Sequence, residues 1–193
     1  CALTHMASVT VVLHVILSHL HSTQKLFLHL LRATEIQYVL FCLFFLQKEH
    51  AFETDPEQHR FKSLPVMNNR ASDINSLEMR PTLSQLHADL KSFEHHFAWL
   101  SRASRKHHHP ALPKLGQMMS LIKSLTSMLE HQMMRVDAQR LSPPSPSLPP
   151  PPPSQFDVLQ SSQELLLQFR LFCDWAQRVF SVLSTKSKMS AVQ

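Results

Sequence analysis

Histidines are the first residues in this sequence whose type and spacing suggest chemistry. A run of three, His107–His109, follows the pair His95 and His96 along the chain. Imidazole is a common zinc ligand, but a structural zinc site needs four ligands at defined spacing, usually with cysteine among them. The chain has no CxxC pair, and the run lies beside Pro110 in a predicted linker. We therefore predict a solvated loop here, with no metal bound.

Two pairs of carboxylates could supply a general acid and a general base: Asp89 with Glu94, and Asp137 with Glu164. Acid–base catalysis requires both groups in one cleft, within hydrogen-bond reach of a substrate. Nothing in their positions along the chain places either pair in one cleft. We interpret them as solvated side chains and predict no catalytic, cofactor-binding or metal-binding residue.

Glycine content separates the possible fold classes. Gly116 is the only glycine in 193 residues. Hairpin turns, phosphate-cradling loops and nucleophile elbows all depend on glycine, so sheet-rich folds and the corresponding enzymes are disfavoured. Apolar residues make up 44% of the chain, enough for the core of a single domain. We predict an all-α protein that is not an enzyme.

Charge and cysteine content exclude other classes. The formal net charge is +5, but the basic residues are scattered and no aromatic residues interleave with them. A nucleic-acid surface combines both features, so no nucleic-acid partner is predicted. Cys1, Cys42 and Cys173 form no disulfide framework, and they leave the redox compartment open.

The element around which the chain is organised is a helix predicted over Pro81–Arg105, of which about residues 81–103 form the second helix of the domain. Its apolar residues recur at alternating steps of three and four, which places them on one stripe of an α-helix. Proline suits a first turn because its missing N–H would have no intrahelical partner there. The stripe consists of Leu83, Leu86, Leu90, Phe93, Phe97 and Leu100.

Three further helices are predicted by the same spacing, over about residues 22–47, 114–140 and 156–184. Ser22 or Thr23 is the expected cap of the first. The last has a core face that includes Cys173, Ala176 and Phe180.

Connection lengths predict the topology. The first link, residues 48–80, is long and the second, at about 103–113, is short. The third, Leu141–Ser154, contains eight prolines and should form a polyproline II strut. At about 3.1 Å per residue it would cover roughly 43 Å. A long, short, long order matches an up-up-down-down four-helix bundle with two long crossover loops.

The N-terminal residues 1–21 are interpreted as the remnant of a signal peptide, with a buried first helical turn as the alternative, in a sequence that begins with Cys1 and is expected to be incomplete. The apolar run Val9–Leu20 is too short to span a bilayer, so no membrane insertion is predicted. Residues 22–186 form the predicted domain, and 187–193 a tail.

One segment conflicts with this pattern. Tyr38–Gln47 is apolar on every face, whereas a surface helix keeps a polar side. Its residue types are those that a translated pyrimidine-rich 3′ intron end would encode. We hypothesise that the native product joins Gln37 to Lys48, and peptides spanning Glu35–Lys48 in purified protein would contradict this.

Several short motifs resemble the interleukin-11 family of long-chain cytokines, which belongs to the interleukin-6 group. They occur in the family's order over roughly residues 22–186. The matching motifs are Leu86–Leu90 and Trp99–Ala103 in the second helix, Ser63–Pro65 in the first crossover, Leu115–Gly116, the proline-rich crossover, and Asp174–Ala176 with Arg178 and Lys186 in the last helix.

The resemblance implies a secreted, extracellular cytokine without cofactors, acting as a monomeric ligand that assembles a receptor complex. It would bind an interleukin-11-type α-receptor and recruit the glycoprotein-130 signalling subunit, activating JAK/STAT signalling and cell proliferation or differentiation. Arg178, Leu64 and Pro65 match the α-receptor site. Phe156 takes the tip position for the signalling subunit, where the family usually has tryptophan.

A second hypothesis comes from another class of protein. The proline run Leu148–Pro153 could bind an SH3 or WW groove, as in an intracellular helical adaptor. Export to the medium would favour the cytokine, and cytosolic retention the adaptor.

Overall fold

The described part of the chain is helical. The computed structural model describes residues 15, 18, 20–25, 28, 32, 61–65, 71–106, 115–142 and 148–190, and no strand occurs among them. Residues 20–25 are helical. The longer elements are α2 (Ala71–Ser76), α3 (Met79–Lys106), α4 (Leu115–Arg135) and α5 (Gln155–Ser190). The predicted all-α class is confirmed.

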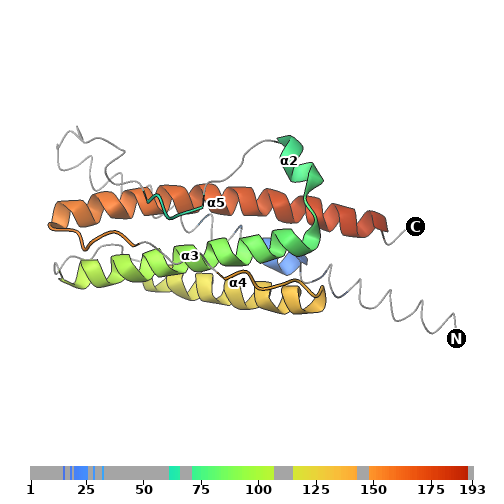
Figure 1. The fold of residues 1–193 in the computed structure, drawn as a ribbon, viewed down its shortest axis with the longest axis horizontal. Helices are drawn as coiled ribbons and strands as arrows, with labels where there is room; N and C mark the ends of the chain where they lie inside the picture. The colour runs from blue at the N-terminus through green and yellow to red at the C-terminus, as the bar shows by residue number, and fades with distance from the viewer. Residues whose placement is uncertain are drawn as a thin grey trace, which may run out of the picture.

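The helices form an elongated bundle in which α3 runs antiparallel to α4, and α5 runs parallel to α4 (Figure 1). The described parts of the connection between α4 and α5 lie toward opposite ends of the bundle (Figure 1). This connection therefore returns along the bundle, as the second predicted crossover requires, and the three long helices have the directions expected for an up-up-down-down bundle.

The end of α4 shows why this helix is shorter than the sequence suggests. Asp137 has a φ of 53°, in the left-handed region, and the Ala138 N–H donates to the Met133 carbonyl over 2.9 Å. This is the Schellman arrangement, which satisfies carbonyls left open at a helix end. The helix stops at Arg135 rather than near residue 140. The end of α5 also differs from the prediction. This helix continues to Ser190, whereas it was expected to end at about residue 184.

The residues after α4 are fastened to α3. The Ser84 hydroxyl donates to the Gln139 carbonyl over 2.6 Å. His87 Nε2 lies 3.1 Å from Glu130 Oε1, and Arg140 Nη2 lies 3.9 Å from Glu130 Oε2. The second crossover thus starts from a fixed point on the bundle.

A capping box begins α5. The Ser154 hydroxyl accepts from the Asp157 N–H over 3.2 Å, and the Asp157 carboxylate accepts from the Ser154 N–H over 3.1 Å. Each side chain satisfies a backbone donor that the first turn leaves open. The cap also places a carboxylate at the positive end of the helix dipole.

Ser154→Ala is expected to lower the free energy of unfolding by about 1 kcal/mol, because the Asp157 N–H loses its acceptor. Denaturant titration followed by circular dichroism measures this loss. Ser124→Ala is the matched control, since the exposed Ser124 hydroxyl only bonds back to the Ser120 carbonyl within α4. Equal losses in the two variants would contradict a capping role.

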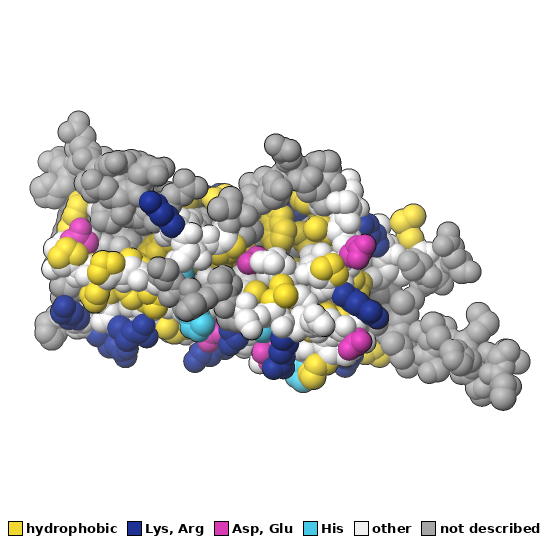
Figure 2. Space-filling model, in the orientation of Figure 1, with side chains coloured by type: hydrophobic (Ala, Val, Ile, Leu, Met, Phe, Trp, Pro, Cys, Tyr) yellow, Lys and Arg dark blue, Asp and Glu magenta, His cyan; other side chains and the backbone are white. Residues whose placement is uncertain are grey.

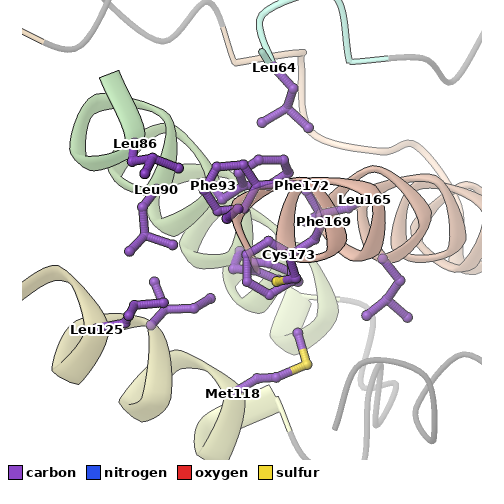
Figure 3. Close-up of a cluster of buried hydrophobic side chains, with 14 of the residues drawn as sticks. Leu64, Leu86, Leu90, Phe93, Met118, Leu125, Leu165, Phe169, Phe172 and Cys173 are labelled. Atoms are coloured by element: carbon purple, nitrogen blue, oxygen red, sulfur yellow. The ribbon is translucent and has the colours of Figure 1, made fainter. Parts of the chain in front are cut away.

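The core lies between α3, α4 and α5. The six residues of the predicted α3 stripe are all 0% exposed. Phe93 and Phe97 on α3 pack against Phe169 on α5 with ring centroids 5.0 and 5.1 Å apart, and Phe172 lies 5.1 Å from Phe93 (Figure 3). Each such side chain contributes roughly 1.5–3 kcal/mol by leaving water.

Cys173 is part of this core (Figure 3). It is completely buried, and burial raises the pKa of its thiol well above the ordinary value. The thiol is therefore protonated and acts as a small apolar side chain.

The first predicted helix joins the bundle through residues near its start. Leu20 belongs to the core, and Gln132 Nε2 on α4 donates to the buried Thr23 hydroxyl over 2.6 Å. Ser22 does not cap this helix, because its hydroxyl bonds to the Ser18 carbonyl one turn earlier. Thr23 is not the cap either, because residues 20–22 before it are already helical.

Several predictions concern residues outside the described ranges. They include Cys1, most of the proposed signal-peptide remnant, Tyr38–Gln47 with Cys42, His107–His109 and the last residues of the tail. Among the described helices, none has the length and apolar character needed to cross a membrane.

Candidate functional site

The outer side of α5 presents a mixed surface near its C-terminal half. Leu171, Asp174, Trp175 and Arg178 recur at helical spacing and so share one side of the helix, which we call the α5 face. Arg178 is exposed over 52% of its side chain, and its guanidinium pairs with the Asp174 carboxylate one turn earlier. The pair keeps the guanidinium at the surface, where it can donate to another protein.

Trp175 forms the apolar centre of the α5 face. It is half-buried and packs against the core, and its Nε1 is buried without a hydrogen-bond partner in the described part of the chain. Leu171 beside it is 48% exposed. Leu171 was not among the residues predicted to form a site. The feature of the sequence that could have identified Leu171 is its position one turn before Trp175, on the side of the helix opposite the predicted core residues.

The first crossover contributes a short segment, residues 61–65, that lies against the bundle. Phe61 and Leu64 are core residues, Lys62 is exposed, and Ser63 and Pro65 are half-buried. Leu64 is only 4% exposed and lies among the core side chains (Figure 3). Its side chain therefore holds the segment in place and has little surface for a partner, unlike the half-buried Pro65.

Phe156 lies in the first turn of α5 and is 43% exposed. It is 22 residues before Arg178, about 33 Å along the same helix. The structure thus does not bring Phe156 and Arg178 together. The two residues therefore belong to two separate surfaces, one in the first turn of α5 and one in its C-terminal half.

Lys186, a residue of the last-helix motif, ties the far end of α5 to the rest of the fold. Its ammonium donates to the Leu77 carbonyl over 2.9 Å, in the turn between α2 and α3. This contact fixes the C-terminal part of α5 relative to α3. Lys186 is therefore occupied by a structural bond in this state.

The carboxylate pairs considered above do not form a catalytic site. Asp89 accepts from Gln85 Nε2 over 2.7 Å, whereas Glu94 pairs with Lys91 over 3.0 Å. Burial raises the pKa of the Asp89 carboxyl to about 6. Asp137 lies in the turn after α4, while Glu164 lies in α5 and accepts from Gln168.

The histidine hypothesis can be tested only at the pair on α3. His95 is exposed, whereas His96 is fully buried with both ring nitrogens in hydrogen bonds. A ring nitrogen that is already bonded is not available to a metal. No group of three metal-ligating side chains occurs among the described residues.

The proline segment lies on the bundle rather than standing free. Leu148 packs against the core, Pro149 is half-buried and Pro152 is buried. In a polyproline II helix residues three apart share an edge, so the edge with Pro149 and Pro152 faces the protein. That edge is closed to an SH3 or WW groove, whereas Pro150 and Pro153, also three apart, are exposed on another edge. No observation in the structure favours the adaptor hypothesis over the cytokine.

Charged side chains are distributed over the face shown in Figure 2. Lys and Arg occur along the length of the bundle, with Asp and Glu between them (Figure 2). The pictured face thus shows no large patch of a single charge.

The described helices form the kind of bundle that was predicted for a long-chain cytokine. Comparison with known sequences specifies the family. The family described as Interleukin 11 matches residues 13–188. The chain is 31% identical over 149 residues to interleukin-11 of Macaca fascicularis, covering 73% of this chain and 71% of the relative. The interleukin-11 proteins of Mus musculus and Rattus norvegicus are each 29% identical over 141 residues. Each of these matches covers 72% of this chain and 70% of the relative. The chain belongs to the interleukin-11 family of cytokines.

Proposed function

We propose that this protein is a secreted ligand that binds an interleukin-11-type α-receptor and recruits the glycoprotein-130 signalling subunit. Membership of the interleukin-11 family is the observation that carries the proposal. The complex would activate JAK/STAT signalling and cell proliferation or differentiation. The two separated surfaces on α5 support it, because a ligand that assembles different receptor chains needs distinct contacts for each.

The α5 face is the proposed α-receptor site, together with Pro65 of the first crossover. It combines a tryptophan in a packed setting with an exposed arginine, the residue types that dominate binding energy in protein interfaces. Phe156 is the proposed contact for the signalling subunit at the start of α5. We leave Leu64 out of the contact surface because its side chain is in the core.

The direct test is binding of the purified chain to the ectodomain of an interleukin-11 α-receptor, measured by surface plasmon resonance. Expression of the full chain in cultured cells, followed by assay of the medium, tests secretion. Binding together with export is the expected result. Cytosolic retention without receptor binding would contradict the proposal.

Arg178→Ala is expected to weaken α-receptor binding by about 2 kcal/mol, roughly 30-fold in Kd, a loss typical of an interface hot spot. The planar guanidinium offers several donors and a long apolar stem, so it contributes both hydrogen bonds and buried area. The thermal stability should hardly change, because the Arg178–Asp174 pair is exposed and such pairs contribute little.

Lys123→Ala is the matched control for this variant. It removes one exposed positive charge from α4, on a helix outside the proposed α-receptor site. Unchanged affinity in Arg178→Ala would remove Arg178 from the site. An affinity loss accompanied by unfolding would show that the arginine has a structural role instead.

A further inference from the structure

The first crossover is held to α3 by one buried histidine. The hydroxyl of Ser63 lies 2.8 Å from His96 Nε2, and His96 Nδ1 lies 2.8 Å from the Ser92 carbonyl. The Ser92 hydroxyl in turn approaches the Ser63 carbonyl at 3.5 Å. We call Ser63, Ser92 and His96 the crossover latch.

The bonding pattern fixes the position of one proton on the His96 ring. A carbonyl oxygen can only accept, so Nδ1 must carry the proton that it shares with Ser92. In neutral imidazole the other nitrogen, Nε2, is then an acceptor, and the Ser63 hydroxyl donates to it. Protonation would reverse this last bond, with Nε2 donating to the Ser63 oxygen, and would place a positive charge in the buried latch.

Aromatic rings close the latch to water. Phe61 stands edge-on to the His96 ring with centroids 5.2 Å apart, and edge-on to Trp99 with centroids 5.6 Å apart. His96 is 0% exposed. An imidazolium formed here would lose hydration without gaining a carboxylate partner, because both ring nitrogens face serine oxygens.

We propose that His96 is a positioning residue for residues 61–65, and that its protonation in mildly acidic surroundings releases this segment from α3. The functional consequence of this release rests on the proposed function, because release would displace Pro65 from the proposed α-receptor contact surface. Binding would then weaken at the pH of an acidified compartment.

The surrounding charges favour release on protonation. On α3 the neighbouring titratable groups are the exposed His95, which disfavours a second positive charge, and Glu94, which is paired with Lys91. The crossover supplies the exposed Lys62. The α5 residues packed at this level, Phe169 and Phe172, are uncharged.

Proton linkage gives the direction of the effect. Burial lowers the pKa of His96 from its ordinary value of 6.5, outweighing the opposite effect of the Ser92 bond. A released His96 would return to the ordinary pKa, so the open state binds the proton more readily than the closed one. The latch is therefore stable at neutral pH and is progressively lost as the pH falls below about 6.5.

Hydrogen–deuterium exchange of the full chain tests the latch without any receptor. The probe is the Leu64 amide, which bonds to the Phe61 carbonyl over 3.1 Å. Its protection, corrected for intrinsic exchange, is compared at pH 7.5 and 5.0 in the native chain and in His96→Gln. Glutamine can accept from Ser63 but does not titrate. Amides in α4 serve as the internal reference for global stability.

We expect the protection of residues 61–65 in the native chain to be progressively lost between pH 7.5 and 5.0, with little change in His96→Gln or in α4. An equal fall in both proteins would overturn the proposal. If the glutamine variant does not hold the segment at pH 7.5, histidine NMR of the native chain decides. The loss of protection must then follow the titration of His96, and a mismatch rejects the latch.

A second measurement separates the latch from the proposed function. The affinity for the α-receptor ectodomain should fall more between pH 7.5 and 5.0 in the native chain than in His96→Gln. Absence of receptor binding at both pH values would count against the proposed function alone, because the exchange result still decides the latch. Binding with the same pH dependence in both proteins would contradict release of the contact surface.

Discussion

Replacement of Leu141–Pro153 by five Gly/Ser residues is expected to abolish the monomeric bundle. Residues 136–140 remain fastened to α3, and Ser154 remains as the cap of α5, so the five new residues, with six Cα–Cα steps from Arg140 to Ser154, must cover the return path. Fully extended, they reach about 21 Å. The α4 helix, with 21 residues, is already about 32 Å long, and α5 runs parallel to it. The chain must therefore misfold or exchange α5 with a second copy.

A thirteen-residue Gly/Ser replacement of the same segment is the matched control, because it keeps the reach and changes only composition. It should fold as a monomer with reduced stability, since proline lowers the entropy of the unfolded chain. Light scattering and thermal melts distinguish the outcomes. A cooperatively melting monomer of the short variant would contradict the parallel arrangement of α4 and α5.

Asp89→Asn is expected to stabilise the protein at pH 7 by up to about 3 kcal/mol, the equivalent of a pKa difference between 3.8 and about 6. The cause is burial of the Asp89 carboxylate, which disfavours its charged form. Asparagine keeps an oxygen for the bond from Gln85 and carries no charge. Urea unfolding at pH 7 measures the gain.

The pH profile of this effect follows from the direction of the shift. A raised carboxyl pKa means that the folded state holds its proton more tightly than the unfolded chain. The stability provided by neutral Asp89 is complete below about pH 4 and is lost as the pH rises through 6. The difference between variant and native protein should therefore be small at pH 4 and full at pH 7. A gain that is constant from pH 4 to 7 would show that charge burial is not the cause.

Asp137→Asn is the control for the Asp89 substitution. Asp137 is exposed in the left-handed turn after α4, a conformation that asparagine adopts readily. The unfolding free energy of the Asp137→Asn variant should stay within about 0.5 kcal/mol of the native value.

The parts of this fold that sequence predicted are those that depend on periodicity. The stripe from Leu83 to Leu100 is entirely buried, because a regular spacing fixes one side of a helix whatever its neighbours are. The antiparallel packing of α3 and α4 and the parallel direction of α4 and α5 followed from the lengths of the connections between them. Neither inference needs knowledge of tertiary contacts.

The parts that sequence could not predict depend on contacts between distant residues. Leu64 lies in a crossover without periodicity, so nothing local shows that it is a core residue. The end of α4 at Arg135 depends on the left-handed conformation of Asp137, a single residue. Asp89 and His96 are polar residues on α3, and their burial depends on what packs over them. For the same reason the crossover latch was visible only in three dimensions.

Complete burial of Cys173 makes this residue a natural reporter of chain opening. Alkylating reagents attack the thiolate, and in the folded state Cys173 is both protonated and shielded from reagent. Modification of Cys173, recognised by the mass of its peptide, would thus record only molecules in which the α3–α5 core has separated. The rate of Cys173 modification would measure how often the core opens under native conditions, without denaturant and without an added label.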